Sequence, residues 1–462
     1  MNENGSAKRV RPQTATAPPS AAAPPSTYKA PTANPALRMM GIPGLPKKLP
    51  SRNWLIFFAV AGSFTAAVVY DKREKRRATA RWSRAVAHLA REPVADPNQL
   101  PRKLAVFLES PPGDGLRVAQ DHFTEYVKPV LAASGLDWEF VQGRKEGDIR
   151  AAVAERIRRA RQPEAAAAAA AKTQDEIVQS VRRKNATPEW QGLRGDIVVG
   201  RHTWKEYVRG LHEGWLGPLV APEPEPKPNA AAAGPAEGEE KTEEGPKPEE
   251  KPERPPQPPP YNTTDDYPTS ALPRLIPAEF SPSAPVEFPH ILGFSNTLIR
   301  LRRFLNRRRL ADDIGREVAA VCLAAAVREY RDGDGDGGAA ADGQPSEQEA
   351  ALAHEEKNWV KSVWKAPDAP REPKKKTEGE GDAATAVAAR PAERIWASPM
   401  VLDPRIAMRM RRFELRGEDE ERARAIEVPE EEVEGWIKGS LRGLYRWAVT
   451  KPAPNPSWPD ED

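Results

Sequence analysis

The chain has 462 residues, of which 50 are proline and 30% are charged, and its formal net charge is +3. Length alone suggests roughly three domains, but proline-rich polar tracts cannot bury enough apolar surface to fold, so we expect fewer. The single cysteine, Cys322, excludes an intramolecular disulfide framework and a multi-cysteine metal cluster.

Residues 1–50 are predicted to form a disordered basic tail. Eight Lys and Arg residues and a single acid, Glu3, precede Trp54. An acid-poor, basic N-terminus resembles a mitochondrial targeting region, although its prolines prevent a long amphipathic helix. We therefore expect an uncleaved tail that is drawn into the matrix.

Residues 51–77 are predicted to be a transmembrane helix with basic flanks. The 17 residues from Trp54 to Tyr70 carry no charge. As a helix they span roughly 26 Å, against a hydrocarbon core of about 27–30 Å. Trp54 and Tyr70 suit the two membrane interfaces, and the flanking Lys and Arg side chains can snorkel. A buried helix of a soluble domain is the alternative, but such a helix is rarely flanked by basic residues on both sides.

Small residues recur along the predicted span at four-residue steps, which lets a second helix approach closely in lipid. Short spans are also often rich in alanine and glycine without packing against anything. The candidate packing residues are Ala59, Gly62, Ser63, Ala66 and Ala67.

Residues 93–220 are predicted to form an α/β domain with a small parallel sheet. Strand-like runs at 103–109, 136–142 and 195–200 alternate with helical patterns that begin near 116, at 148 and near 203. Thr203 and Glu206 have the spacing of a capping box for the last of these helices. Ala165–Ala171 reads as a helical insertion.

The remaining chain alternates predicted linkers with helical pieces. Helical regions are expected at 262–331, 351–365 and 393–450, the last opened by Pro429. The segments expected to be disordered are the Pro/Glu-rich linker 221–260, then 332–350 and 366–392, with a tail at 451–462.

Candidate catalytic and metal-binding motifs are weak. The turn Gly113–Gly115 sits where a phosphate-binding loop would lie, but it lacks the third glycine of that motif, and a plain turn explains it as well. Asp332, Asp334 and Asp336 begin a calcium-loop pattern, but Gly343 replaces the glutamate that the loop requires. Cys322 reads as a core thiol. We therefore expect no catalytic residue, cofactor or metal.

Arginines alternate with apolar residues within the predicted helical region 262–331. Leu298, Leu301, Phe304 and Leu305 separate Arg300, Arg302, Arg303, Arg307, Arg308 and Arg309. Such a helix suits anionic lipid or an acidic partner, although a solvated charged face is equally compatible. Nucleic acid is a poor partner, because the net charge is near zero and a membrane span is predicted.

Four segments carry a family resemblance: residues 34–77, 111–150, 195–219 and 302–321. They resemble the roughly 54-kDa subunit of the carrier protein translocase of the mitochondrial inner membrane, as found in fungi. The first segment is the most specific one. The poly-alanine insert and the acidic linker look like additions particular to this sequence.

The resemblance implies a single-pass inner-membrane protein with its N-terminus in the matrix and its large domain in the intermembrane space. It implies a non-enzymatic scaffold role in inserting multispanning carrier precursors. The implied partners are the channel-forming and other translocase subunits, the small intermembrane-space chaperones and the inner-membrane ATP-dependent protease. The alternative is a membrane-anchored α/β enzyme that acts on a phosphorylated or lipid substrate at Gly113–Gly115.

Overall fold

The computed structural model describes residues 51–93, 99–162, 174–188, 190, 192–220, 257–331, 345–365 and 393–449. The chain divides into two units, Met1–Ser63 and Phe64–Asp462. Several predicted segments lie wholly or mostly outside the described residues: the tail 1–50, Ala165–Ala171, the linker 221–260, the tract 332–350 with its aspartates, the tract 366–392 and the tail 451–462.

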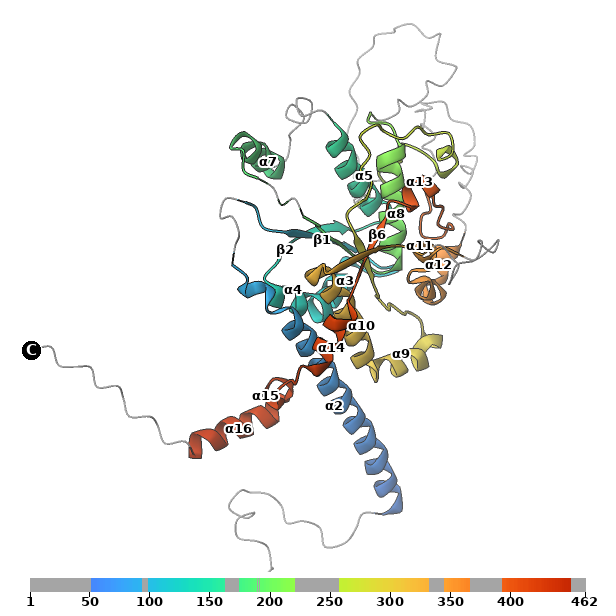
Figure 1. The fold of residues 1–462 in the computed structure, drawn as a ribbon. Coiled ribbons are helices and arrows are strands. Elements are labelled where there is room, and N and C mark those ends of the chain that lie inside the picture. Colours follow the sequence, from blue (N-terminus) through green and yellow to red (C-terminus); the bar gives the residue numbers. More distant parts are fainter. Residues whose placement is uncertain are drawn as a thin grey trace, which may run out of the picture. The chain divides into compact units, whose positions relative to one another are not determined.

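Helix α2 (Arg52–Val86) contains the predicted span (Figure 1). Among the described residues it is the one helix long and apolar enough to cross a membrane, and none of its apolar window is buried. We expected this segment to end near residue 77. The helix continues because residues 72–86 contain no glycine or proline and are mostly strong helix formers.

A six-stranded, mostly parallel sheet forms the centre of the second unit, which confirms the predicted α/β class. Its strand order is β2-β1-β3-β4-β6-β5, and the β5–β6 pair alone is antiparallel. The strands are β1 (Lys103–Glu109), β2 (Asp137–Gly143), β3 (Asp196–Val199), β4 (Ser283–Val286), β5 (Ala326–Glu329) and β6 (Arg411–Glu414). The central strands β1, β3 and β4 are almost wholly buried, as expected where helices cover both faces.

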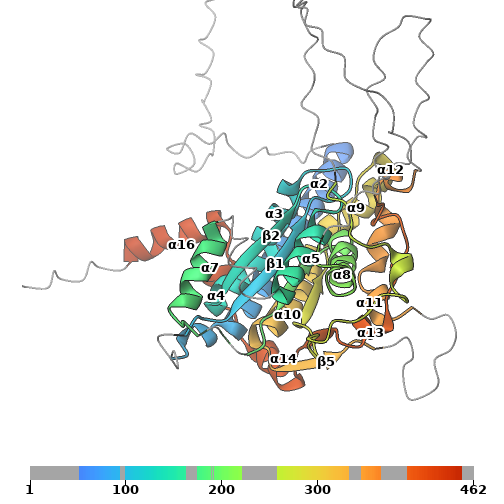
Figure 2. The same ribbon diagram turned by 90° about the horizontal axis from the view of Figure 1, so that it is seen from above.

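Helices cover the two faces of the sheet (Figure 2). Leu104, Val106 and Leu108 of β1 point to one face and form part of a core there. The helices that contribute to this core are the end of α2, α3 (Leu116–His122), the π turn η2 (Phe123–Val127), α4 (Lys128–Ser134), α10 (Arg307–Leu323) and α14 (Gly417–Ala425). Ala105 and Phe107 point the other way, against α5 (Asp148–Arg161) and α8 (Arg201–Leu216). The alternation along β1 therefore builds two separate cores.

Helices α5 and α8 pack unusually closely. A Cβ atom at Gly210 would lie 2.7 Å from the carbonyl oxygen of Arg150, a distance that real side chains do not show. The glycine is therefore required by this helix contact.

The sheet extends well beyond the predicted 93–220 domain. Regions 262–331 and 393–450, which we expected to be helical, supply β4, β5 and β6. Each of these strands has four residues, too few to show a sequence pattern of its own. We expected two helices or one long broken helix over residues 294–330. The structure has two, α9 (Thr297–Phe304) and α10, which are separated at Leu305 and Asn306. α10 stops at Ala324, whose φ is +47°, and β5 follows it.

The predicted capping box of α8 is wrong. The helix begins at Arg201, with Gly200 as its N-cap residue and no side-chain cap. Thr203 and Glu206 lie inside the helix and are fully buried. Similarly, the predicted helix at 116–130 contains the π turn η2.

The remaining elements are short or peripheral. They are η1 (Leu89–Arg91), α7 (Gln174–Lys184), η3 (Thr264–Asp266), η4 (Phe294–Asn296), α9 (Thr297–Phe304), α11 (Glu347–Ala350), η5 (Ala353–Asn358), α12 (Lys361–Trp364), α13 (Pro404–Ala407), α15 (Glu430–Val433) and α16 (Trp436–Val449).

Candidate functional sites

The part of α2 that follows the span is built into the folded domain. Asp71, one residue after Tyr70, is 3% exposed. Its carboxylate accepts the backbone N–H groups of Arg307 and Arg308, at 3.1 and 3.3 Å. A carboxylate is favourable at this position because the N-terminus of a helix carries partial positive charge. Asp71 therefore joins α10 to the turn of α2 that follows the span.

Trp82 makes the second contact between α2 and α10. Its indole Nε1 donates to Asp312 Oδ1 at 2.6 Å. The indole also lies on Gly315, where a Cβ atom would be 2.3 Å from the ring. The two helices approach this closely because residue 315 has no side chain.

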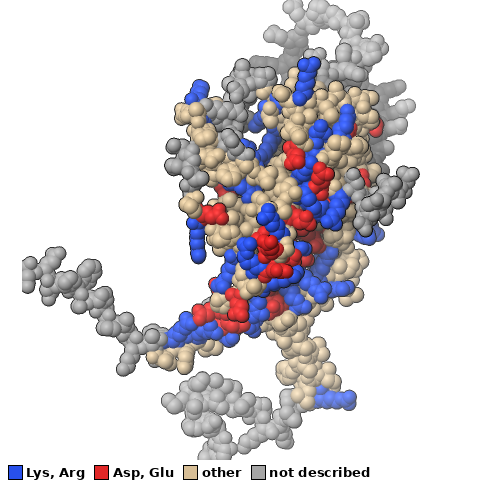
Figure 3. Space-filling model, in the orientation of Figure 1, with Lys and Arg blue, Asp and Glu red and all other residues tan. Residues whose placement is uncertain are grey.

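Four arginines after the span contact the acidic segment 427–434, which precedes α16, whereas Lys75 pairs with Glu125. Snorkelling of the flanking basic side chains towards the membrane surface stays a prediction. Surface ion pairs contribute little stability one at a time, so these contacts mainly position that segment. The contacts are Arg73 and Arg77 with Glu430, Arg76 with the Glu434 carbonyl, and Arg84 with Glu432 and the Glu427 carbonyl. Figure 3 shows the resulting mixture of basic and acidic side chains over α2 and α15.

The predicted arginine-rich helix is divided between two elements. Arg300, Arg302 and Arg303 lie on α9, whereas Arg307, Arg308 and Arg309 form the first turn of α10. The Arg308 guanidinium lies 5.1 Å from the centre of the Tyr70 ring. Beside these arginines, Leu298 of α9 is 79% exposed. The structure thus brings an exposed basic and apolar helix near the end of the span.

The predicted packing face of the span is open in the described structure. Ala59, Gly62, Ser63, Ala66 and Ala67 are all exposed, and no described atom lies within 4 Å of a Cβ atom built on Gly62. Trp54 and Tyr70 are also exposed. Their roles in packing and at the membrane interface remain predictions.

The turn Gly113–Gly115 lies where an α/β enzyme would bind its ligand. β1 leads to α3 on one face and β3 leads to α8 on the other, so the two strands flank a topological switch point. The turn itself is exposed, and other parts of the chain approach it only at Gly113. A Cβ atom on Gly113 would lie 3.2 Å from Leu292 and 3.3 Å from Val360.

Carboxylates of the chain itself occupy the helix N-termini at this edge. Glu206 accepts the N–H groups of Gly147, Ile149 and Arg150 at the start of α5, at 2.7–3.2 Å. Glu355 accepts the Arg201 N–H at the start of α8, at 2.8 Å. These are the groups that would otherwise bind a phosphate. The internal carboxylates therefore weaken the enzyme alternative.

Glu109 and Glu206 form a buried acidic pair. Both side chains are fully buried, and neither carboxylate oxygen of Glu109 has a hydrogen-bond partner among the described residues. Burial raises the pKa of Glu206 to about 7, and burial together with the neighbouring Glu206 raises the pKa of Glu109 well above its usual range. Because Glu206 accepts several N–H groups, it is the ionised member, and Glu109 holds the proton.

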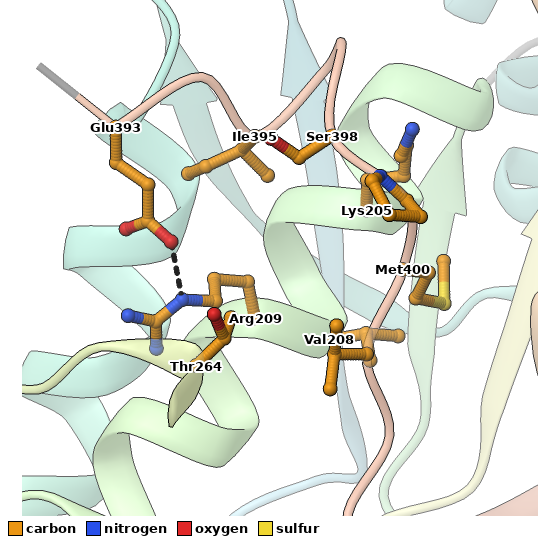
Figure 4. Close-up of a pocket in the computed structure, with 10 residues that line it drawn as sticks. Lys205, Val208, Arg209, Thr264, Glu393, Ile395, Ser398 and Met400 are labelled. Carbon is orange, nitrogen blue, oxygen red and sulfur yellow. Dashed lines mark hydrogen bonds and ion pairs between the residues drawn. The ribbon is translucent and has the colours of Figure 1, made fainter. Parts of the chain in front are cut away.

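Two hollows lie near these carboxylates. The first, about 30 Å³ between α8 and residues 393–401, has room for about one water molecule (Figure 4). Arg209 and Glu393 pair across it at 2.8 Å. The second is an open hollow of about 340 Å³ beside Gly113, with Glu146, Lys365 and Arg394 in its wall. No histidine or cysteine is among the described residues that line either hollow.

The chain is similar to known subunits of a mitochondrial translocase. A family model described as "Inner membrane protein import complex subunit Tim54" matches residues 34–413. The mitochondrial import inner membrane translocase subunit tim54 of Neurospora crassa is 58% identical over 431 residues, 90% of this chain and 88% of that protein. The tim54 subunit of Aspergillus oryzae is 43% identical, over 83% of this chain and 89% of that protein. The tim54 subunit of Schizosaccharomyces pombe is 34% identical, over 69% of this chain and 87% of that protein.

Proposed function

The chain belongs to the Tim54 family of inner membrane protein import complex subunits, and from this premise we propose that it is the membrane-anchored scaffold of a translocase that inserts multispanning carrier proteins. The family by itself supports a more general statement: the protein is an import translocase subunit of the mitochondrial inner membrane. The residues that the structure describes include one candidate membrane helix. The family name is that of a translocase subunit, which supports a non-enzymatic role.

One observation carries the scaffold role: the span continues into the folded domain as a single helix. α2 runs unbroken from Arg52 to Val86, and Asp71 and Trp82 fix it to α10. Within the second unit, helix rather than a flexible linker therefore joins the end of the predicted span, Phe64–Tyr70, to the α/β domain. Such tethering raises the effective concentration of a bound partner beside the channel.

The proposed arrangement places residues 1–50 in the matrix and the α/β domain in the intermembrane space. The domain docks the small chaperones that deliver carrier precursors. The small-residue face around Gly62 packs against the channel-forming or another translocase subunit, and α9 meets anionic lipid or an acidic partner. The inner-membrane ATP-dependent protease is a further proposed partner.

Import of a radiolabelled carrier precursor into mitochondria depleted of this protein tests the proposal. A matrix precursor with a presequence serves as control, and the membrane potential is measured in parallel. We expect carrier insertion to fall while matrix import proceeds normally. Normal insertion of both precursors would overturn the carrier role.

The enzyme alternative is tested by Asp114→Asn combined with Gly115→Ala. Gly115 has an ordinary φ of −95°, and no described atom lies within 4 Å of its Cβ position, so the alanine fits without strain. A scaffold should support carrier insertion at the rate of the unmodified protein. Loss of function in a variant that still melts normally would favour chemistry at the turn.

A further inference from the structure

Helix α16 has an apolar face that no described part of the chain covers. Leu441, Leu444, Tyr445 and Val449 are 62–67% exposed. Their spacing places them on one side of the helix, which a soluble domain would normally bury.

A basic stripe that is bound to the chain itself runs along one edge of this apolar side, beside Tyr445 and Val449. Lys438 lies 3.0 Å from Glu434, Arg442 lies 2.5 Å from the same carboxylate, and Arg446 pairs with Glu431. These three residues are four apart, so they share one stripe. Segment 427–434 therefore lies along that edge, and Leu441 and Leu444, farther round the helix, stay exposed.

The start of α16 is fixed close to the end of the membrane span. Arg76 of α2 donates to the carbonyl oxygen of Glu434 at 3.0 Å, two residues before Trp436 begins α16. Tyr70 lies six residues before Arg76, which is roughly 9 Å along a helix. The headgroup layer on each side of a bilayer is about 5–8 Å thick. With Tyr70 at the membrane interface, as the sequence predicts, α16 begins at the depth where headgroups meet water.

We propose that α16 is a second membrane contact, lying on the bilayer surface with Leu441, Leu444 and Tyr445 among the lipid chains. Lipid is the occupant favoured here, because the helix begins at the membrane surface and its exposed side is apolar. Its basic residues are already paired with glutamates, so apolar insertion rather than attraction to anionic lipid holds it there. This contact does not depend on which precursors the translocase inserts.

Depth-dependent quenching of a fluorescent label in the full-length protein tests the proposal. Cys322 is buried and is removed as Cys322→Ala. A nitrobenzoxadiazole label is then placed through Leu444→Cys or, as the matched control on the side of α16 opposite the apolar residues, Gly443→Cys, where no described atom lies within 4 Å of the Cβ position. Both proteins are reconstituted into phosphatidylcholine nanodiscs, with and without cardiolipin.

The label at 444 should emit at shorter wavelength than the control and be quenched by doxyl-labelled lipid. Iodide should quench it at least about threefold less than the control, because the interfacial region excludes the ion. Cardiolipin and raised salt should change little. Equal iodide quenching of the two labels would overturn the proposal. So would protection from iodide without quenching by doxyl lipid, since that result indicates a protein contact.

A second variant tests the same contact without depending on label chemistry at 444. Leu441→Glu with Leu444→Glu changes only exposed side chains, so the fold should persist. A label at Val449→Cys should then become at least about threefold more accessible to iodide. An unchanged label at 449 would show that the apolar side does not hold the helix on lipid.

Discussion

Single residues decide how α2 is held by the domain. Gly315 faces Trp82, and a Cβ atom there would overlap the indole. We predict that Gly315→Ala lowers the free energy of unfolding by about 1–3 kcal/mol, the usual cost of overpacking. Thermal unfolding of the detergent-solubilised protein measures this.

Gly443→Ala is the matched control for this substitution, because no described atom lies within 4 Å of its Cβ position. It should be neutral or raise the free energy of unfolding by about 0.5–1 kcal/mol. Equal effects at the two positions would contradict the close contact of Gly315 with Trp82.

A buried histidine makes the stability of the protein depend on pH. His212 Nδ1 lies 2.8 Å from the Val208 carbonyl, and Nε2 accepts the Asp403 N–H at 2.9 Å. Both nitrogens are used by the neutral ring, and burial lowers the pKa of His212 to about 4. The unfolded chain binds a proton at about pH 6.5, so the contribution of this ring is lost as pH falls from 6.5 to 4.

We therefore predict that the destabilisation caused by His212→Asn is largest near pH 7.5 and shrinks below pH 6.5. The change should be up to about 1.4 kcal/mol per pH unit, measured by chemical unfolding at several pH values. Val153→Ala, which removes a buried side chain that does not titrate, should cost the same at every pH. A constant cost for His212→Asn would show that the ring is not held neutral.

At the scale of elements, the buried acidic pair predicts unequal effects for two similar residues. Glu206 holds the first turn of α5 and accepts the Trp396 indole N–H, whereas Glu109 has no partner among the described residues. Glu206→Gln should lower the free energy of unfolding by about 1–3 kcal/mol, because each carboxylate oxygen accepts two N–H groups and the glutamine NH₂ would leave two of them unpaired. Glu109→Gln should cost less than about 1 kcal/mol, because the native carboxyl is already neutral.

Denaturant unfolding of the two variants at pH 7.5 measures this difference. Because the pKa of Glu206 is raised from 4.5 to about 7, the unmodified protein should lose stability as pH rises from about 4.5 to 7, and the Glu206→Gln variant should not show this loss. Equal costs for the two substitutions would reverse the assignment of the proton.

The membrane helix itself predicts a defect in assembly rather than in folding. Gly62→Leu places a large side chain on the small-residue face, and we expect it to weaken recovery of the other translocase subunits at least about fivefold. Val68→Phe enlarges the opposite side of α2 and serves as the control. Co-purification from gently solubilised mitochondria measures both. Normal recovery with Gly62→Leu would exclude this face as a packing surface.

At the scale of the whole molecule, the strand order predicts that region 93–220 cannot fold alone. β3 needs β4 beside it, and the core that covers β1 includes Val286, Ile314 and Val318 from later in the chain. A fragment of residues 79–220 should show no cooperative unfolding transition, whereas residues 64–449 should show one. Circular dichroism during heating measures both.

Adding residues 257–449 in trans should restore the transition of the short fragment. Cooperative unfolding of residues 79–220 by themselves would instead support the smaller domain that the sequence suggested.

Several features of this protein could be read from the sequence alone. The span, the strands β1, β2 and β3, and the helices α5 and α8 were expected near their observed positions. Their signals are local: an uncharged apolar run, buried strand runs and apolar residues at helical spacing. The resemblance in four segments also led to the family that the comparisons confirm.

The tertiary structure decided how these parts are joined. The strands β4, β5 and β6 are four residues long and are recognised only by the strands they pair with, which lie far away in sequence. Asp71, Glu206 and Glu355 read as ordinary polar residues until their backbone partners are seen. The basic residues after the span look the same in sequence whether they meet lipid headgroups or the acidic segment 427–434. A charge alone does not specify its partner, whereas the folded chain brings that partner from more than 340 residues away.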